Sequence, residues 1–328
     1  MIDERLSRCV AAFMPGATGV KDIAKLSGGA SQETWRFDIL APDGRIGAIL
    51  RRSPEGYGAA PGRAAGLGNE AALMQLAYGA GVRSPRVLHV LRPEDDLGTG
   101  FIMSRIEGET IARKILRDAE FADARPRLAR QLGGIAAGIH GIARTRLPEL
   151  RMMTSSSEIA ELGREYRSFG WPRPVFELAL CWLSEHDPGP PDEVTLVHGD
   201  FRHGNLIVGA DGVRAVLDWE LTHLGDPMED LGWICVTSWR FGEIDKPVGG
   251  FGSREELFAG YEAAGRTVDP ARVMFWEVMG TLRWGVMCCG MMQRFRQSPD
   301  HSMERAVIGR RASETEIDLL RLLAPREA

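Results

Sequence analysis

The spacing of apolar and polar residues divides the chain into two parts. Short runs in which the two kinds alternate, as in strands, cover residues 21–27, 33–40, 46–52, 86–92 and 100–106. Turn sequences such as "SGGAS" and "APDG" separate the first three runs, as in an antiparallel meander. Helical spacing occurs here over residues 1–14 and 69–79. This part is predicted to be a small antiparallel sheet of about five strands with a helix.

From residue 107 onward the spacing becomes that of amphipathic helices. It covers residues 110–119, 125–144, 157–168, 174–186, 227–239, 253–264, 269–295 and 302–323. Only residues 196–220 interrupt it, with short β-rich runs around the turn "GADG", which predicts a hairpin. We therefore predict an α+β fold of two lobes, an N-lobe of residues 1–105 and a mainly helical C-lobe of residues 106–328.

The interrupting segment carries polar side chains that a hairpin would bring together. It contains "LVHGDFRHGNLIV" and "VLDWE", with Asp200, Asn205 and Asp218 at the ends of apolar runs. Mg²⁺ prefers a few hard oxygen ligands, so Asn205 and Asp218 are the predicted metal ligands. Asp200 is then free to act as general base toward a hydroxyl group.

Composition excludes several classes of protein. The net charge of −5 argues against a broad grip on nucleic acid or anionic lipid. Five cysteines without a C-x-x-C motif favour neither a disulfide framework nor a zinc site. No 18-residue apolar stretch and no signal peptide are found, so a cytoplasmic protein without nucleic-acid or membrane partners is expected.

The motifs resemble those of a known family. "HGDFRHGN" followed by "LDWE" is similar to the H-x-D-x-x-x-x-N and D-F-G motifs of kinases, as they occur in the aminoglycoside phosphotransferase family, with Trp219 and Glu220 replacing Phe and Gly. "THLGDPMEDLGW" also resembles this family, whose relatives include choline kinases. Within it, the chain looks most like domains related to those fused to acyl-CoA dehydrogenases. The resemblance implies a protein-kinase-like fold, ATP, Mg²⁺ and phosphoryl transfer to a hydroxyl group of a small molecule.

The resemblance also implies a nucleotide site in the small lobe, with a glycine turn and a strand cation. Gly28, Gly29 and Ser31 in "LSGGASQETWRF" are candidates for the turn. No lysine lies between residues 26 and 113, so Arg51 or Arg52 would replace the family's usual lysine. Arg51 is favoured because it directly follows the apolar run.

Further nucleotide contacts are predicted from the helix and the last strand of the small lobe. Glu70 lies on an apolar helical stripe, and a buried carboxylate there would need Arg51 as counter-ion. The alternative is an exposed glutamate stabilised by the helix dipole. Backbone groups from Met103 to Arg105, where the family connects its lobes, would bind the base.

Other polar residues are interpreted as structural. His198 is predicted to hold the loop by packing and hydrogen bonds. Asp226 and Asp230 are expected at a helix start, with Asp226 as the candidate brace for the catalytic loop. The cysteines and methionines of "VMCCGMMQRF" are expected to fill the core.

The acceptor and some alternatives remain open. From residue 240 onward there are thirteen basic and thirteen acidic residues, so the acidic excess that suits an aminoglycoside is missing. Trp239, Trp276 and Trp284 are predicted to form a partly apolar acceptor wall. A nucleotide-binding pseudokinase and a metal-dependent hydrolase are the alternatives. The sequence does not decide between ATP and GTP, the role of Glu220 or the oligomeric state.

Overall fold

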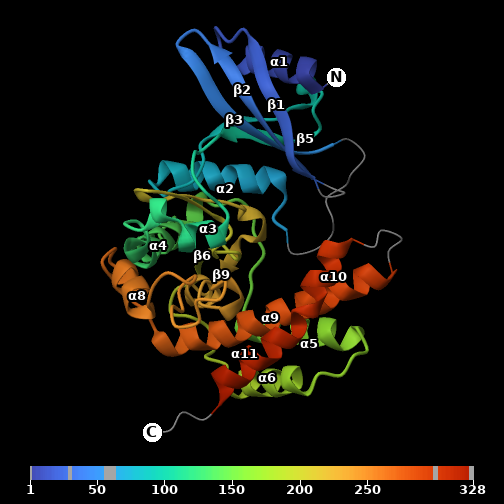
Figure 1. The fold of residues 1–328 in the computed structure, drawn as a ribbon, viewed down its shortest axis with the longest axis vertical. Coiled ribbons are helices and arrows are strands. Elements are labelled where there is room, and N and C mark those ends of the chain that lie inside the picture. The colour runs from blue at the N-terminus through green and yellow to red at the C-terminus, as the bar shows by residue number, and fades with distance from the viewer. Residues whose placement is uncertain (1, 29–31, 55–63, 298–301, 325–328) are drawn as a thin grey trace.

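The computed structural model describes residues 2–28, 32–54, 64–297 and 302–324. A β-sheet forms the upper lobe in Figure 1, and a larger, mainly helical lobe lies below it. This arrangement confirms the predicted α+β fold of two lobes. Among the described residues, no helix is both long and apolar enough to cross a bilayer.

The upper lobe is one antiparallel sheet with the strand order β1-β2-β3-β5-β4. Its strands are β1 (Gly19–Gly28), β2 (Glu33–Ala41), β3 (Gly44–Ser53), β4 (Val87–Val90) and β5 (Thr99–Ser104). Helix α1 (Ile2–Phe13) packs on one face, where Leu50 of β3 belongs to the same buried cluster as Leu6. Since neighbouring strand residues point to opposite faces, Arg51 points to the other face.

Helix α2 (Leu67–Gly79) lies under that other face, between the sheet and the lower lobe (Figure 1). Its Leu73 and Met74 belong to the large core cluster, which continues into the helical lobe. Glu70 lies in the first turn of α2 and only 2% of its surface is exposed. Arg51 and Glu70 are therefore directed at the same region, the boundary between the lobes.

The lower lobe is built around the long helix α9. Its helices are α3 (Ala112–Arg117), α4 (Arg125–His140), α5 (Ser155–Ser168), α6 (Pro174–Glu185), α7 (Met228–Trp233), α8 (Arg254–Glu262), α9 (Pro270–Gln297), α10 (Met303–Arg310) and α11 (Ala312–Leu323). The predicted hairpin is present as β7 (Leu206–Gly209) and β8 (Gly212–Val216). A second pair, β6 (Thr195–Val197) with β9 (His223–Gly225), includes a strand that sequence spacing did not indicate.

Two predicted helices are shorter than expected. The helix predicted over 227–239 ends at Trp233 because the Arg240 guanidinium donates to the carbonyl oxygen of Cys235 and turns the chain. A 3₁₀ turn, Thr237–Trp239, follows. The helix predicted over 302–323 is interrupted at Arg311, and the two shorter helices both pack against α9.

Candidate active site

The loop between β6 and β7 carries the predicted catalytic base. Gly199 has φ of +80°, and a Cβ atom there would lie 2.5 Å from the carbonyl oxygen of Leu221. Only glycine fits this close approach, which lets the chain turn sharply before Asp200. Asp200 thus enters the boundary between the lobes from a tightly held turn.

The Asp200 carboxylate accepts hydrogen bonds on both oxygens. Trp233 Nε1 and Arg202 Nε donate to Oδ1, each over 2.9 Å. Asn205 Nδ2 donates to Oδ2 over 2.5 Å and to the Asp200 backbone carbonyl over 3.0 Å. These donors hold the carboxylate in one orientation. Neither Trp233 nor Arg202 was among the predicted site residues.

The β7–β8 hairpin brings Asn205 and Asp218 together. The Leu217 N–H donates to the Asn205 carbonyl oxygen over 2.8 Å, so Asn205 lies opposite the residue before Asp218. The amide nitrogen of Asn205 is engaged by Asp200, which leaves Oδ1 as the oxygen available to a metal. Asp218 has φ of +66°, rare for a residue with a Cβ atom, and such backbone strain clusters at functional sites.

Arg51 crosses from the sheet to this hairpin and contacts three carboxylates. Its Nη2 lies 3.0 Å from Asp218 Oδ1 and 2.9 Å from Glu220 Oε2. Its Nε lies 3.3 Å from Glu70 Oε2, so the ion pair predicted from the helical stripe is present. Arg52 points the other way and pairs with Glu33, as the alternation of a strand requires. Arg51 is thus the arginine of the lobe boundary.

Three carboxylates share one guanidinium here, so negative charge is in excess. Burial, together with the charges of Asp218 and Glu220, raises the pKa of Glu70 to about 7 in spite of Arg51. Burial and Asp218 also raise the pKa of Glu220. Such carboxylates are stabilised by a divalent cation, and oxygen ligands from Asp218, Glu220 and Asn205 suit Mg²⁺. The residues present therefore fit a magnesium ion.

The remaining residues predicted to bind the nucleotide do not lie at the contacts of Arg51. Gly28 ends strand β1 and pairs with Glu33, while Gly29 and Ser31 lie outside the described residues. Directly after β5, the N–H of Arg105 donates to the Gly47 carbonyl oxygen, and the Arg105 side chain pairs with Asp38 and Glu107.

These hydrogen bonds correct part of the prediction that backbone groups from Met103 to Arg105 bind the nucleotide base. The N–H of Ser104 donates to Arg86, so the backbone donors of both Ser104 and Arg105 are used within the lobe. Both N–H groups donate to backbone carbonyl oxygens of neighbouring segments, and the spacing of residues in the sequence did not indicate these hydrogen bonds. Met103 is half-buried against the main core and stays a candidate for packing on the base.

A buried carboxylate of α7 supports the catalytic loop from below. Asp230 accepts the backbone N–H groups of His198 over 2.8 Å and Gly199 over 3.0 Å. His140 Nε2 lies 3.0 Å from its Oδ2, and all these groups are buried. The expected brace, Asp226, instead accepts the N–H of Met228 and pairs with Arg272. Asp226 precedes α7, whereas Asp230 lies within the helix and binds the backbone of the loop.

Replacing Asp230 by asparagine is expected to lower the free energy of unfolding by about 3–5 kcal/mol, since an amide cannot replace an anion among buried donors. Urea denaturation followed by fluorescence would measure this. Asp211, exposed and paired with Arg214, is the matched control, and asparagine there should cost less than about 1 kcal/mol. A loss under about 1 kcal/mol for Asp230→Asn would contradict the support role.

Trp233 is held between Asp200 and a buried ionic network. The Arg283 guanidinium lies 5.2 Å from the Trp233 ring centre and pairs with Glu158 and Glu229. Burial alone would raise the pKa of Glu229, but Arg283 and His223 outweigh burial and lower it to about 2. The network therefore stays charged at neutral pH and keeps the Trp233 indole directed at Asp200.

Aromatic rings continue from Trp233 away from the catalytic aspartate. Trp239 lies 5.3 Å from Trp233 and 4.9 Å from Trp284, measured between ring centres. Arg202 lies over the Trp239 ring at 4.7 Å and Arg311 over the Trp284 ring at 5.7 Å. We call Trp233, Trp239 and Trp284 the indole wall. Trp276 was predicted to share this wall, but its ring contacts Phe275 and its Cβ packs against Gly232 of α7, whereas Trp233 and Trp239, which are also buried, are in ring contact with each other and, through Trp239, with Trp284.

The histidine of the loop has the expected structural position. His198 is fully buried, and its Nδ1 accepts the Asp200 N–H over 3.2 Å. Its ring packs edge-on against Trp219, at 4.9 Å between ring centres. Burial lowers the pKa of His198, so the ring is neutral and suited to accepting that hydrogen bond.

Comparison with known proteins agrees with this geometry. The chain matches the phosphotransferase enzyme family over residues 22–274. It is 26% identical to acyl-CoA dehydrogenase family member 11 of Gallus gallus over 246 residues, 71% of this chain and 30% of that protein. It is 28% identical to family member 10 of Mus musculus over 233 residues, 67% of this chain and 21% of that protein. The chain thus spans under a third of these relatives.

Solved structures share the fold over the whole length. A candidate aminoglycoside phosphotransferase from Ralstonia eutropha has a TM-score of 0.73 at 21% identity, with 97% of each chain covered. A choline/ethanolamine kinase family protein from Mesorhizobium loti has a TM-score of 0.60 at 22% identity, with 99% of this chain and 96% of that chain covered. Aminoglycoside phosphotransferase APH(4)-Ia, in a ternary complex with AMP-PNP and hygromycin B, has a TM-score of 0.60 at 15% identity, covering 98% and 99%.

Proposed function

We propose, because the chain belongs to the phosphotransferase enzyme family, that it transfers the γ-phosphoryl group of ATP to a hydroxyl group of a small molecule with the help of Mg²⁺. One observation carries the proposal. Asp200, with both oxygens oriented by donors, lies on the same loop as Asn205, whose partner strand leads directly to Asp218. The proposed base and metal ligands thus come from the loop directly before the β7–β8 hairpin and the residues directly after it.

In this proposal each residue acts on a different part of the reaction. Asp200 accepts the proton of the acceptor hydroxyl as its oxygen attacks the γ-phosphorus, and ADP leaves. Asn205 and Asp218 hold Mg²⁺, which supplies positive charge to the phosphate oxygens when bound. Arg51 binds the α- and β-phosphates, and Glu70 keeps its guanidinium directed at the lobe boundary. Glu220 assists Arg51 or the metal.

The two lobes would divide these tasks. Residues 1–105 would bind the nucleotide, with Arg51, Glu70, Met103 and the turn at Gly28 as its contacts. Residues 106–328 would carry the base, the metal ligands and the acceptor site. We place this boundary after β5, where the chain leaves the sheet toward α3.

The indole wall indicates the chemistry of the acceptor. It begins at the tryptophan that binds Asp200, and arginines lie over two of its rings. Polycationic aminoglycosides need carboxylates at such a place, whereas indoles and arginines suit a partly apolar molecule with a neutral or anionic group. We therefore propose a hydroxylated metabolite of that kind, including acyl-type molecules, rather than an aminoglycoside.

A second candidate function is that of a nucleotide-binding protein without activity. It is favoured by the contacts of Arg51 with Asp218 and Glu220, because this guanidinium lies against oxygens that a catalytic metal would need. Asp200, with its complete set of donors, argues against it, since a binding protein has no use for an oriented base.

A screen of the purified protein tests the proposal. One pool would contain hydroxylated metabolites, both anionic and neutral, and a separate pool would contain aminoglycosides. Each pool would be incubated with ATP or GTP, and the formation of ADP or GDP would be measured with and without Mg²⁺. We expect Mg²⁺-dependent ADP formation above the acceptor-free rate, with a phosphorylated product seen by mass spectrometry. If the protein binds nucleotide but no pool gives turnover, the second candidate function, a nucleotide-binding protein without activity, is favoured. Fast turnover in the aminoglycoside pool alone would contradict the proposed acceptor.

A further inference from the structure

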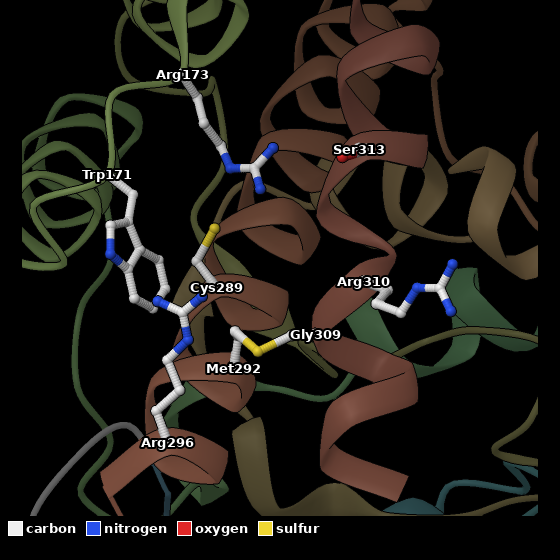
Figure 2. A pocket seen from close by; sticks show the side chains of 8 residues that line it. All are labelled: Trp171, Arg173, Cys289, Met292, Arg296, Gly309, Arg310 and Ser313. Atoms are coloured by element: carbon white, nitrogen blue, oxygen red, sulfur yellow. The ribbon is translucent and has the colours of Figure 1, made fainter. Parts of the chain in front are cut away.

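A cationic cavity lies away from the loop that carries Asp200, between α9, the α10–α11 junction and the turn that precedes α6. It has a volume of about 480 Å³. The residues that line it, shown in Figure 2, are Trp171, Arg173, Cys289, Met292, Arg296, Gly309, Arg310 and Ser313. Three of them are arginines and none is acidic. We call this cavity the arginine pocket.

Two guanidinium groups of the arginine pocket lie on opposite sides of Cys289. In Figure 2, Arg173 and Arg296 both extend toward Cys289, whereas Arg310 extends away from it. Glu316 pairs with Arg173 at 2.5 Å and offsets one of the charges. Within the described part of the chain, Arg296 and Arg310 form no ion pair, and the buried Nε of Arg173 makes no hydrogen bond. Positive charge is therefore left at the cavity.

The other lining groups are apolar or neutral. The Arg296 guanidinium lies 4.6 Å from the Trp171 ring centre, which holds it beside the cavity. Burial raises the pKa of the Cys289 thiol, so no thiolate neutralises the arginines. Met292 is half-buried and packs against Gly309. The pocket thus combines a cationic end with an apolar side.

We propose that the arginine pocket binds a small organic anion, with a phosphate or carboxylate group between Arg173 and Arg296 and an apolar part against Met292 and Trp171. Guanidinium groups match the planar or tetrahedral oxygen sets of these anions and bind them with charge-assisted hydrogen bonds. The apolar part gains from burial on the methionine and the indole. An inorganic anion would contact the arginines but not the apolar side of the pocket.

The arginine pocket is separate from the indole wall but connected to it. Arg310 lines the pocket, and the next residue, Arg311, lies over Trp284 of the wall. Along α9, Trp284 and Met292 are eight residues apart, or about 12 Å at 1.5 Å per residue. The pocket could therefore hold either the far end of a long acceptor or a separate effector molecule with the same chemistry.

Calorimetric titration with 1-naphthyl phosphate tests the site on the full chain. Saturation with ADP and Mg²⁺ beforehand keeps the probe out of the nucleotide site. We expect one probe per chain, and binding at least about tenfold weaker in Arg296→Gln, because a charge-assisted hydrogen bond is lost. Inorganic phosphate and 1-naphthol, each carrying half of the probe, should bind more weakly than the whole.

Arg294→Gln is the matched control. Arg294 is exposed on the same helix, contacts Met291 and does not line the pocket, so affinity should be unchanged. Equal binding by wild type and Arg296→Gln, or no binding to the folded wild type, would overturn the proposal. Since binding requires no catalysis, this result is independent of the proposed phosphoryl transfer.

The kinetics of Arg296→Gln with an acceptor from the screen would identify the source of the anion. A raised KM for that acceptor would show that the pocket holds the acceptor's own anionic end. An unchanged KM, with loss of any effect of 1-naphthyl phosphate on the rate, would show a separate effector. Both results support the site and assign its ligand.

Discussion

Replacing Asp200 by asparagine is expected to lower kcat by about 10²–10⁴-fold, the range that general-base catalysis contributes. The amide keeps the size of the side chain but has no carboxylate to take the hydroxyl proton. Nucleotide affinity should change little, because Asp200 contacts Trp233, Arg202 and Asn205 and not the small lobe. Steady-state kinetics with an acceptor from the screen, together with ADP titration, would measure both quantities.

The control for this variant is Asp245→Asn, an exposed aspartate of the same lobe, which should retain the wild-type rate. A second variant, Trp233→Phe, keeps the ring but removes one donor to Asp200. Its kcat should fall less than that of Asp200→Asn, because the carboxylate is kept and only one of its orienting hydrogen bonds is lost. Wild-type kcat in Asp200→Asn would rule out the base assignment.

Asp218→Asn is expected to lower the Mg²⁺-dependent rate by about 10³-fold or more. Charge stabilisation by a metal ion contributes several kcal/mol, and each 1.36 kcal/mol corresponds to a factor of ten. The variant loses the carboxylate that lies beside Asn205 and should therefore bind divalent metal more weakly. Titration with Mn²⁺, followed by electron paramagnetic resonance, gives a readout that does not depend on turnover.

Asp218→Asn also removes one of the carboxylates that contact Arg51, and this provides an internal check. With one carboxylate fewer around the guanidinium, the pKa of Glu70 should fall below its value of about 7, because Asp218 is one cause of the rise. Asp211→Asn, in the turn of the same hairpin, should leave metal binding unchanged. Unaltered Mn²⁺ affinity in Asp218→Asn would place the metal elsewhere.

The positions of Glu70 and Arg51 followed from local rules. A carboxylate on an apolar helical stripe must be buried, and a buried charge requires a partner. Arg51 is favoured over Arg52 because it directly follows the apolar run of its strand, and the period of a strand turns the two side chains to opposite faces. These inferences need only neighbours a few residues apart, and the structure contains the pairing.

The partners of Asp200 could not be obtained in this way. Trp233 reaches Asp200 because α7 packs against α9, where Arg283 lies over the indole. Asp230, interpreted as a residue of the first helical turn, supports the catalytic loop because β6 ends directly above it. Both contacts join segments more than thirty residues apart, and their direction depends on helix packing.

The boundaries of elements show the same division. The two lobes, the sheet and the hairpin with its polar residues follow from periodicity and turns, because burying one face of each element dictates which residues alternate. The interruption at Arg311 and strand β9 depend on contacts with distant segments, as does the engagement of the Arg105 amide by Gly47. Local sequence carries the chemistry of this chain, and packing between its helices assigns each side chain its partner.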